Sequence, residues 1–116
     1  AEVEAAEEAA LDRFVRPLGE RVQVVEGRAE VLPGIGVLHT PGHTPGHQVV
    51  QVGDLVLTGD VVLHPVQVAD PSVPYLYDDD PDLAVVTRTK LLEQVGAERG
   101  VIATAHFAEP FTRLGG

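Results

Sequence analysis

The chain has 116 residues, enough for one domain (1–116), and 44% of them are hydrophobic, which fits a small globular core. Its formal net charge of −10 argues against nucleic acid as a partner, because phosphate binding requires clustered lysines and arginines. The absence of cysteine excludes disulfides and thiolate catalysis and fits a cytoplasmic protein. No apolar run approaches the roughly 20 residues that cross a bilayer, and no leader pattern is present, although Ala1 could follow a removed segment. We therefore expect a cytoplasmic protein with no membrane partner.

The first predicted element is a helix over residues 4–18. Its apolar residues recur at i, i+3, i+4 and i+7, which predicts one buried stripe made of Leu11, Phe14, Val15 and Leu18. Short β-prone runs follow at residues 22–25, 29–32, 35–39, 48–52 and 55–58. Gly53-Asp54 joins the last two runs in what we expect to be a tight hairpin. Residues 61–80 are rich in proline and aspartate and have no clear period, which predicts a long loop.

A second helix is predicted to begin at Asp80-Pro81-Asp82, with an aspartate as N-cap and proline at the first helical position. Gly96 or Gly100 ends it, and residues 101–105 form a last short strand that leads into His106. The acidic residues at both predicted helix starts are interpreted as solvated carboxylates: Glu2, Glu4, Glu7, Glu8, Asp78, Asp79, Asp80 and Asp82. This order predicts an α+β fold, a mostly antiparallel sheet with helices on one face and nothing to cover the other.

Three predicted strands lead into polar residues that suit metal binding. Residues 40–47 read Thr-Pro-Gly-His-Thr-Pro-Gly-His, and their tight turns hold a histidine rigidly, as a metal ligand requires. Residues 55–58 run into Asp60, and residues 101–105 run into His106. Each alone has a simpler interpretation, a turn aspartate capping its own backbone or an edge histidine. Together they place ligand types suited to zinc, iron or manganese at strand ends, which meet at one edge of a sheet.

The octet, the Thr-Gly-Asp at 58–60 and the strand ending in Ala-His resemble the C-terminal half of the metallo-β-lactamase superfamily, in its lactonase-like and organophosphate-hydrolase-like branch. The resemblance implies half of a four-layered αββα sandwich. It implies that His43 ligates the first metal, Asp60 bridges both metals and His106 ligates the second. His47 then supports the turn, and His39 falls outside the ligand set.

The same resemblance implies a metal-dependent hydrolase with two divalent metal ions, zinc first and iron or manganese as alternatives. A metal-bound hydroxide attacks an ester, lactone, thioester or phosphoester bond of a small-molecule substrate. Asp60 and His64 are the expected catalytic residues, with His64 in the substrate-pocket loop. Tyr75, Tyr77 and Phe107 are weaker candidates for lining that pocket.

The sequence departs from the family pattern because the His-x-His-x-Asp-His motif of the family's first half is absent. No two of the five histidines are separated by one residue. Three interpretations follow. The chain is a fragment or split-enzyme half whose partner supplies the missing N-terminal half, or it pairs with a second copy of itself, or it is a stand-alone binding module without activity.

Overall fold

The computed structural model describes residues 1–115 of the chain. Its helices are α1 (Glu2–Ala10), α2 (Val66–Ala69) and α3 (Pro81–Ala97), and α1 continues into a π-helical turn (Leu11–Val15) and a 3₁₀ turn (Arg16–Arg21). Its strands are β1 (Arg28–Leu32), β2 (Ile35–His39), β3 (Gln48–Val52), β4 (Leu55–Leu57), β5 (Val101–Ala103) and β6 (Phe111–Arg113). Among these residues, no helix has the length and apolar composition that crossing a membrane requires.

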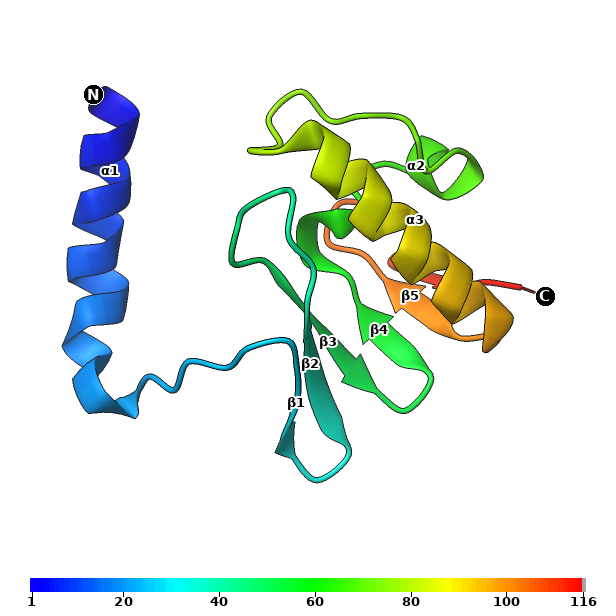
Figure 1. Cartoon of the computed structure of the whole chain (residues 1–116), viewed down its shortest axis with the longest axis horizontal. Coiled ribbons are helices and arrows are strands. Elements are labelled where there is room, and N and C mark those ends of the chain that lie inside the picture. The colour runs from blue at the N-terminus through cyan, green and yellow to red at the C-terminus, as the bar shows by residue number, and fades with distance from the viewer. Residues whose placement is uncertain (116) are drawn as a thin grey trace.

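The six strands form one sheet in chain order, β1 to β6 (Figure 1). Every neighbouring pair is antiparallel except β4 and β5, which are parallel because α3 carries the chain back between them. The predicted strands 35–39 and 48–52 have their predicted bounds. The hairpin between β3 and β4 turns at Gly53, whose φ of 61° explains the glycine.

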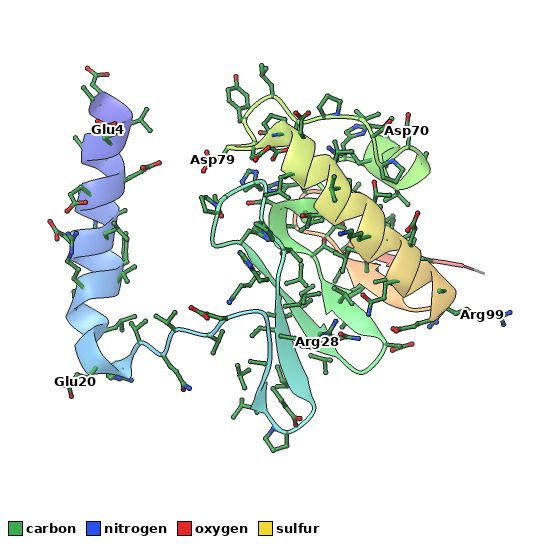
Figure 2. The ribbon with its side chains drawn as sticks, viewed as in Figure 1. Glu4, Glu20, Arg28, Asp70, Asp79 and Arg99 are labelled. Atoms are coloured by element: carbon green, nitrogen blue, oxygen red, sulfur yellow. The ribbon has the colours of Figure 1, made fainter. Side chains whose placement is uncertain are left out.

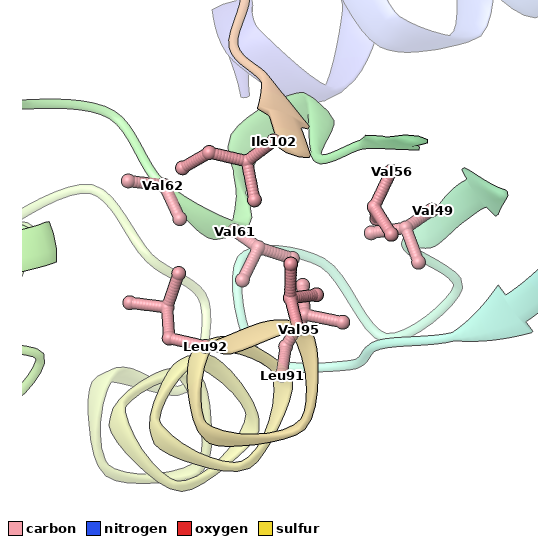
Figure 3. Packing of buried hydrophobic residues seen from close by; sticks show 8 residues of the cluster. All are labelled: Val49, Val56, Val61, Val62, Leu91, Leu92, Val95 and Ile102. Atoms are coloured by element: carbon pink, nitrogen blue, oxygen red, sulfur yellow. The ribbon is translucent and has the colours of Figure 1, made fainter. Parts of the chain in front are cut away.

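The core lies between α3 and one face of the sheet. Figure 3 shows its eight buried residues, which are Val49, Val56, Val61, Val62, Leu91, Leu92, Val95 and Ile102. The helix begins as predicted: the Asp80 carboxylate accepts a hydrogen bond from the Leu83 amide at 3.0 Å, and Pro81 follows it. The predicted fold class is therefore confirmed, a mixed α+β fold with a mostly antiparallel sheet and a helix on one face.

The N-terminal helix does not join that layer. Figure 1 shows α1 standing apart from the sheet, and no residue of α1 or of the two turns that follow it is buried. Glu4 and Glu20 mark the two ends of this arm in Figure 2. The prediction of a buried stripe is wrong because amphipathic spacing shows that a helix has an apolar side but not what that side meets.

Three segments also differ from the prediction. Residues 22–25 are not a strand but a connection with largely exposed side chains. The side-chain amide of Gln48 donates a hydrogen bond to the Val25 carbonyl and so ties this connection to the sheet. The predicted loop at 61–80 contains α2. The last strand, β6, was not predicted, since the run Phe111–Arg113 is too short to show alternation.

Candidate metal centre

The sheet brings the three candidate ligands to one edge. Because β2, β3 and β4 alternate in direction and β5 is parallel to β4, strands β2, β4 and β5 all run the same way. His43 lies in the turn after β2, Asp60 in the 3₁₀ turn after β4 (Gly59–Val61), and His106 in the loop after β5. Strand ends that point the same way deliver their following residues to a common edge, as predicted.

Asp60 is the centre of this cluster. Its Oδ2 lies 3.2 Å from Nε2 of His43, and its Oδ1 lies 3.1 Å from Nε2 of His106. One carboxylate thus faces two imidazoles, one through each oxygen. The side chain of His43 is 21% exposed and that of His106 is 56% exposed, so the cluster opens to solvent on the His106 side.

Asp78 contacts the ring nitrogen of His43 that does not face Asp60. Nδ1 of His43 lies 2.8 Å from Oδ1 of Asp78, whose side chain is fully buried. This contact fixes the orientation of the His43 ring, with Nε2 turned toward Asp60. The interpretation of Asp78 as a solvated helix-start carboxylate is therefore wrong, whereas Asp79 is exposed at the tip before α3 (Figure 2).

His47 holds the backbone of Asp60. The Asp60 amide donates to Nε2 of His47 at 3.0 Å, and Nδ1 of His47 lies 2.8 Å from the Thr40 hydroxyl oxygen. His47 is therefore neutral, with its proton on Nδ1. The pKa of His47 lies below its ordinary value, chiefly because burial disfavours the charged ring. The charge of Asp60 opposes this shift and His43 adds to it, and the lowered pKa agrees with the neutral form.

Two glycines allow the chain to approach this closely. Gly59 has a φ of +51°, and a Cβ there would lie 2.8 Å from Nε2 of His47. Gly42 has a φ of +139°, and a Cβ there would lie 2.4 Å from Cα of Ala84 in α3. The Pro-Gly turns thus place His43 against the helix, and Gly59 places Asp60 against His47.

The donor chemistry of the cluster fits part of a two-metal site. A zinc ion bound to a nitrogen and an oxygen at about 2.0–2.2 Å with a tetrahedral angle separates those atoms by about 3.4 Å, a few tenths of an ångström more than the two contacts of Asp60. No group of three or more histidine and carboxylate side chains within residues 1–115 is arranged to hold one ion. Each ion would therefore have two donors from this chain, fewer than the four that zinc usually takes.

The other histidines lie outside the cluster. Nδ1 of His64 accepts a hydrogen bond from the Val66 amide at 3.1 Å, and its ring is exposed, so the structure does not bring it to Asp60. Nε2 of His39 lies 2.6 Å from the Pro45 carbonyl oxygen. Both are engaged with local backbone.

The aromatic candidates divide between two places. The Tyr75 ring lies 6.1 Å from the His43 ring, and Tyr77 packs edge-on against Tyr75 at 5.6 Å. Phe107 instead packs against the hydrophobic core and lines an open apolar cavity of about 470 Å³ beside α2. Of the three aromatic candidates, Tyr75 is therefore the one whose ring lies near the ring of a candidate ligand.

The sequence alone did not identify Asp78 or Arg88 as residues of the site. Arg88 is fully buried in α3. Arg88 had a detectable signal, since it falls on the buried stripe of its helix together with Ala84, Leu91, Leu92 and Val95. A charge at a stripe position indicates a buried pair. Asp78 had no such signal, because it stands in an acidic run without a period.

No protein-family profile matches the chain. It is 37% identical over 92 residues to an N-acyl homoserine lactonase of Bacillus thuringiensis, a match that covers 75% of this chain and 36% of the relative. The chain thus spans about a third of the length of the curated relatives it matches.

Two solved structures share the fold over 90% of the chain and 38% of their own length. One is AidC, a dizinc quorum-quenching lactonase in complex with a homoserine product, with a TM-score of 0.77 and 21% identity. The other is AbOPH, a hydrolase in the β-lactamase superfamily, with a TM-score of 0.72 and 28% identity. By sequence and by fold, this chain is a homologue of the metallo-β-lactamase-superfamily lactonases and fits the C-terminal half of the lactonase-like branch.

Proposed function

We propose that this chain supplies part of the two-metal centre of a hydrolase that opens a lactone or a related ester. The observation that carries the proposal is Asp60, whose two carboxylate oxygens each face the Nε2 atom of a different histidine. A carboxylate that bridges two ions needs this disposition. The names of the relatives, N-acyl homoserine lactonases among them, support the lactone as substrate class.

In this proposal His43 would hold one ion, His106 would hold the other and Asp60 would bridge them, with zinc as the metal because a dizinc relative shares the fold. When bound, such ions lower the pKa of a coordinated water and polarise a carbonyl. The contributions of the chain are positional. Asp78 orients the His43 ring through Nδ1, and His47 fixes the backbone of Asp60.

The remaining ligands come from outside residues 1–116 in this proposal, because each ion has only two donors here. They reside either in a preceding half of a longer protein or in a partner chain. His64 remains a proposed substrate contact. Its Nδ1 is engaged with the Val66 amide, so Nε2 is the atom left to meet a substrate.

The test combines metal analysis with hydrolysis. The chain is mixed with the N-terminal portion of the B. thuringiensis lactonase and zinc, then assayed with an N-acyl homoserine lactone. We expect about two zinc ions per complete site, and loss of hydrolysis on Asp60→Asn or His106→Gln. His39→Gln is the matched control, because the His39 ring bonds the Pro45 carbonyl rather than Asp60, and this variant should keep full activity. An absence of bound zinc, or undiminished hydrolysis with Asp60→Asn, would contradict the proposal.

The self-pairing and binding-module alternatives make different predictions. Self-pairing requires a dimer by light scattering at micromolar concentration, with the exposed face of the sheet buried between copies. A binding module requires a folded chain whose melting temperature is the same with and without a chelator. A monomer stabilised by zinc contradicts both.

A further inference from the structure

A single buried arginine connects the segments that carry the candidate ligands. The Arg88 side chain is fully buried in α3, and its Nε donates to the Val61 carbonyl at 2.8 Å, next to Asp60. Its Nη1 donates to the carbonyls of Pro71 and Val73 at 2.9 and 3.1 Å. The guanidinium therefore ties the turn that bears Asp60 to the loop that leads to Asp78.

The remaining nitrogen of Arg88 faces Asp78. Nη2 lies 3.8 Å from Oδ2 of Asp78, and both side chains have no exposed surface. Within residues 1–115, these are the two buried side-chain polar atoms that lack a hydrogen-bond partner, so each is the counter-charge of the other. The second oxygen of Asp78 binds Nδ1 of His43. A continuous path thus runs from Arg88 through Asp78 to His43.

We propose that Arg88 is a positioning residue that aligns two candidate metal ligands at once, His43 through the Asp78 carboxylate and Asp60 through the Val61 carbonyl. Arg88 is the buried partner that holds the Asp78 carboxylate in place, and Asp78 in turn holds the His43 ring through Nδ1, with Nε2 turned toward Asp60. The proposal rests on the proposed function insofar as His43 and Asp60 are metal ligands.

A purely structural role would not require an arginine here. Arg88 occupies a position on the apolar stripe of α3, and a well-packed apolar residue at such a site is often at least as stable as a buried ion pair. A lysine has one compact ammonium and cannot reach four oxygens in the planar arrangement that a guanidinium spans. The geometry uses all three guanidinium nitrogens, two of them to set backbone and one to set charge.

The experiment measures how His43 is held in the metal-free chain and the zinc affinity of the same samples. Long-range ¹H–¹⁵N spectra show whether Nδ1 of His43 is hydrogen-bonded to Asp78 and whether the ring has one environment, and competition with a chromophoric chelator gives the affinity for zinc alone. The variants are Arg88→Lys and Asp78→Asn. Arg28→Lys is the matched control, since Arg28 is an exposed arginine that donates to Gln51 on the sheet surface.

We expect wild-type His43 to give one set of ring signals, with Nδ1 hydrogen-bonded to Asp78. Arg88→Lys and Asp78→Asn should give more than one ring environment for His43 and a zinc affinity about 10- to 100-fold weaker, the usual effect of losing a partner of a metal ligand. Arg28→Lys should change neither quantity. If Arg88→Lys fails to fold, Asp78→Asn decides, because it leaves the three backbone hydrogen bonds of Arg88 in place.

A wild-type His43 whose Nδ1 lacks the hydrogen bond to Asp78 would overturn the proposal, even if neither variant folds. Unchanged ring signals and zinc affinity in the variants would also overturn it. A wild-type chain that binds no zinc, but whose variants lose the single ring environment of His43, would support the positioning role of Arg88 and contradict the metal-dependent function. The two proposals therefore fail separately.

Discussion

Gly59 connects backbone geometry to the candidate centre, and replacing it with alanine tests that connection. Gly59 precedes Asp60, has a φ of +51°, and leaves no room for a side chain because a Cβ would lie 2.8 Å from Nε2 of His47. Gly59→Ala should therefore strain the backbone and push His47 off the Asp60 amide.

The expected cost has two parts. Holding alanine in the left-handed region costs about 1–2 kcal/mol. Displacing His47 leaves the Asp60 amide without its acceptor, which costs about 1–2 kcal/mol more for a partly buried donor. The free energy of unfolding should thus fall by about 2–4 kcal/mol, and each kcal/mol lowers the melting temperature by about 4 °C in a chain of this size.

Two other glycines separate these contributions. Gly53 has a φ of +61° and open space around a Cβ, so Gly53→Ala should show the backbone cost alone, about 1–2 kcal/mol. Gly46 has open space and an ordinary φ, so Gly46→Ala should change stability by less than about 0.5 kcal/mol. Urea unfolding of the three variants gives the free energies, and the ¹⁵N spectrum of His47 shows whether its hydrogen bond is lost. The reasoning is refuted if Gly59→Ala is no less stable than Gly53→Ala, or if His47 keeps its bond.

Three further predictions concern separate elements. Asp80→Ala removes the N-cap acceptor of α3 and should cost about 1 kcal/mol in urea unfolding, with Asp79→Ala, an exposed neighbour, as a near-neutral control. Ile102→Ala empties a fully buried position and should cost about 2–5 kcal/mol; a loss below 1 kcal/mol would contradict the packing in Figure 3. Hydrogen bonds from Ser72 lower the pKa of Asp70 below its ordinary 3.8, so the associated stability is present above 3.8 and is lost as pH falls through the lowered pKa. Ser72→Ala should raise that pKa in a carboxyl ¹³C titration, and an unchanged midpoint would argue against the bond.

The sheet and the second helix were predictable because their signals are local. The β-prone runs at 35–39 and 48–52, the Gly53 hairpin and the Asp80-Pro81 cap each depend on a few neighbouring residues, and the structure reproduces all of these. The environment of the N-terminal helix was not predictable, because the apolar spacing at Leu11 and Phe14 does not identify what the helix packs against. Short strands such as β6 depend on a neighbouring strand rather than on their own composition.

The candidate site also contains residues that could be predicted from the sequence and residues that could not. The strands that lead into His43, Asp60 and His106 could be recognised one by one, and the common direction of β2, β4 and β5 then brings these residues together. The Asp78–Arg88 pair could not be anticipated, since it joins a loop to a helix through side chains distant from the motifs. Acidic residues in a run look alike in sequence, and burial alone separates Asp78 from Asp79.

The parallel register of β4 and β5 has a consequence for the order of folding. Leu57 pairs with Ala103, and Asp60 and His106 each follow their strand residue by the same three positions. A slip of two residues would move His106 by about 6.6 Å and break its contact with Asp60. This pairing spans 46 residues, so we expect loop-closure entropy to delay it relative to the hairpins. The Asp60–His106 contact is then expected late in folding, and a signal from it would report that the crossover has closed in the correct register.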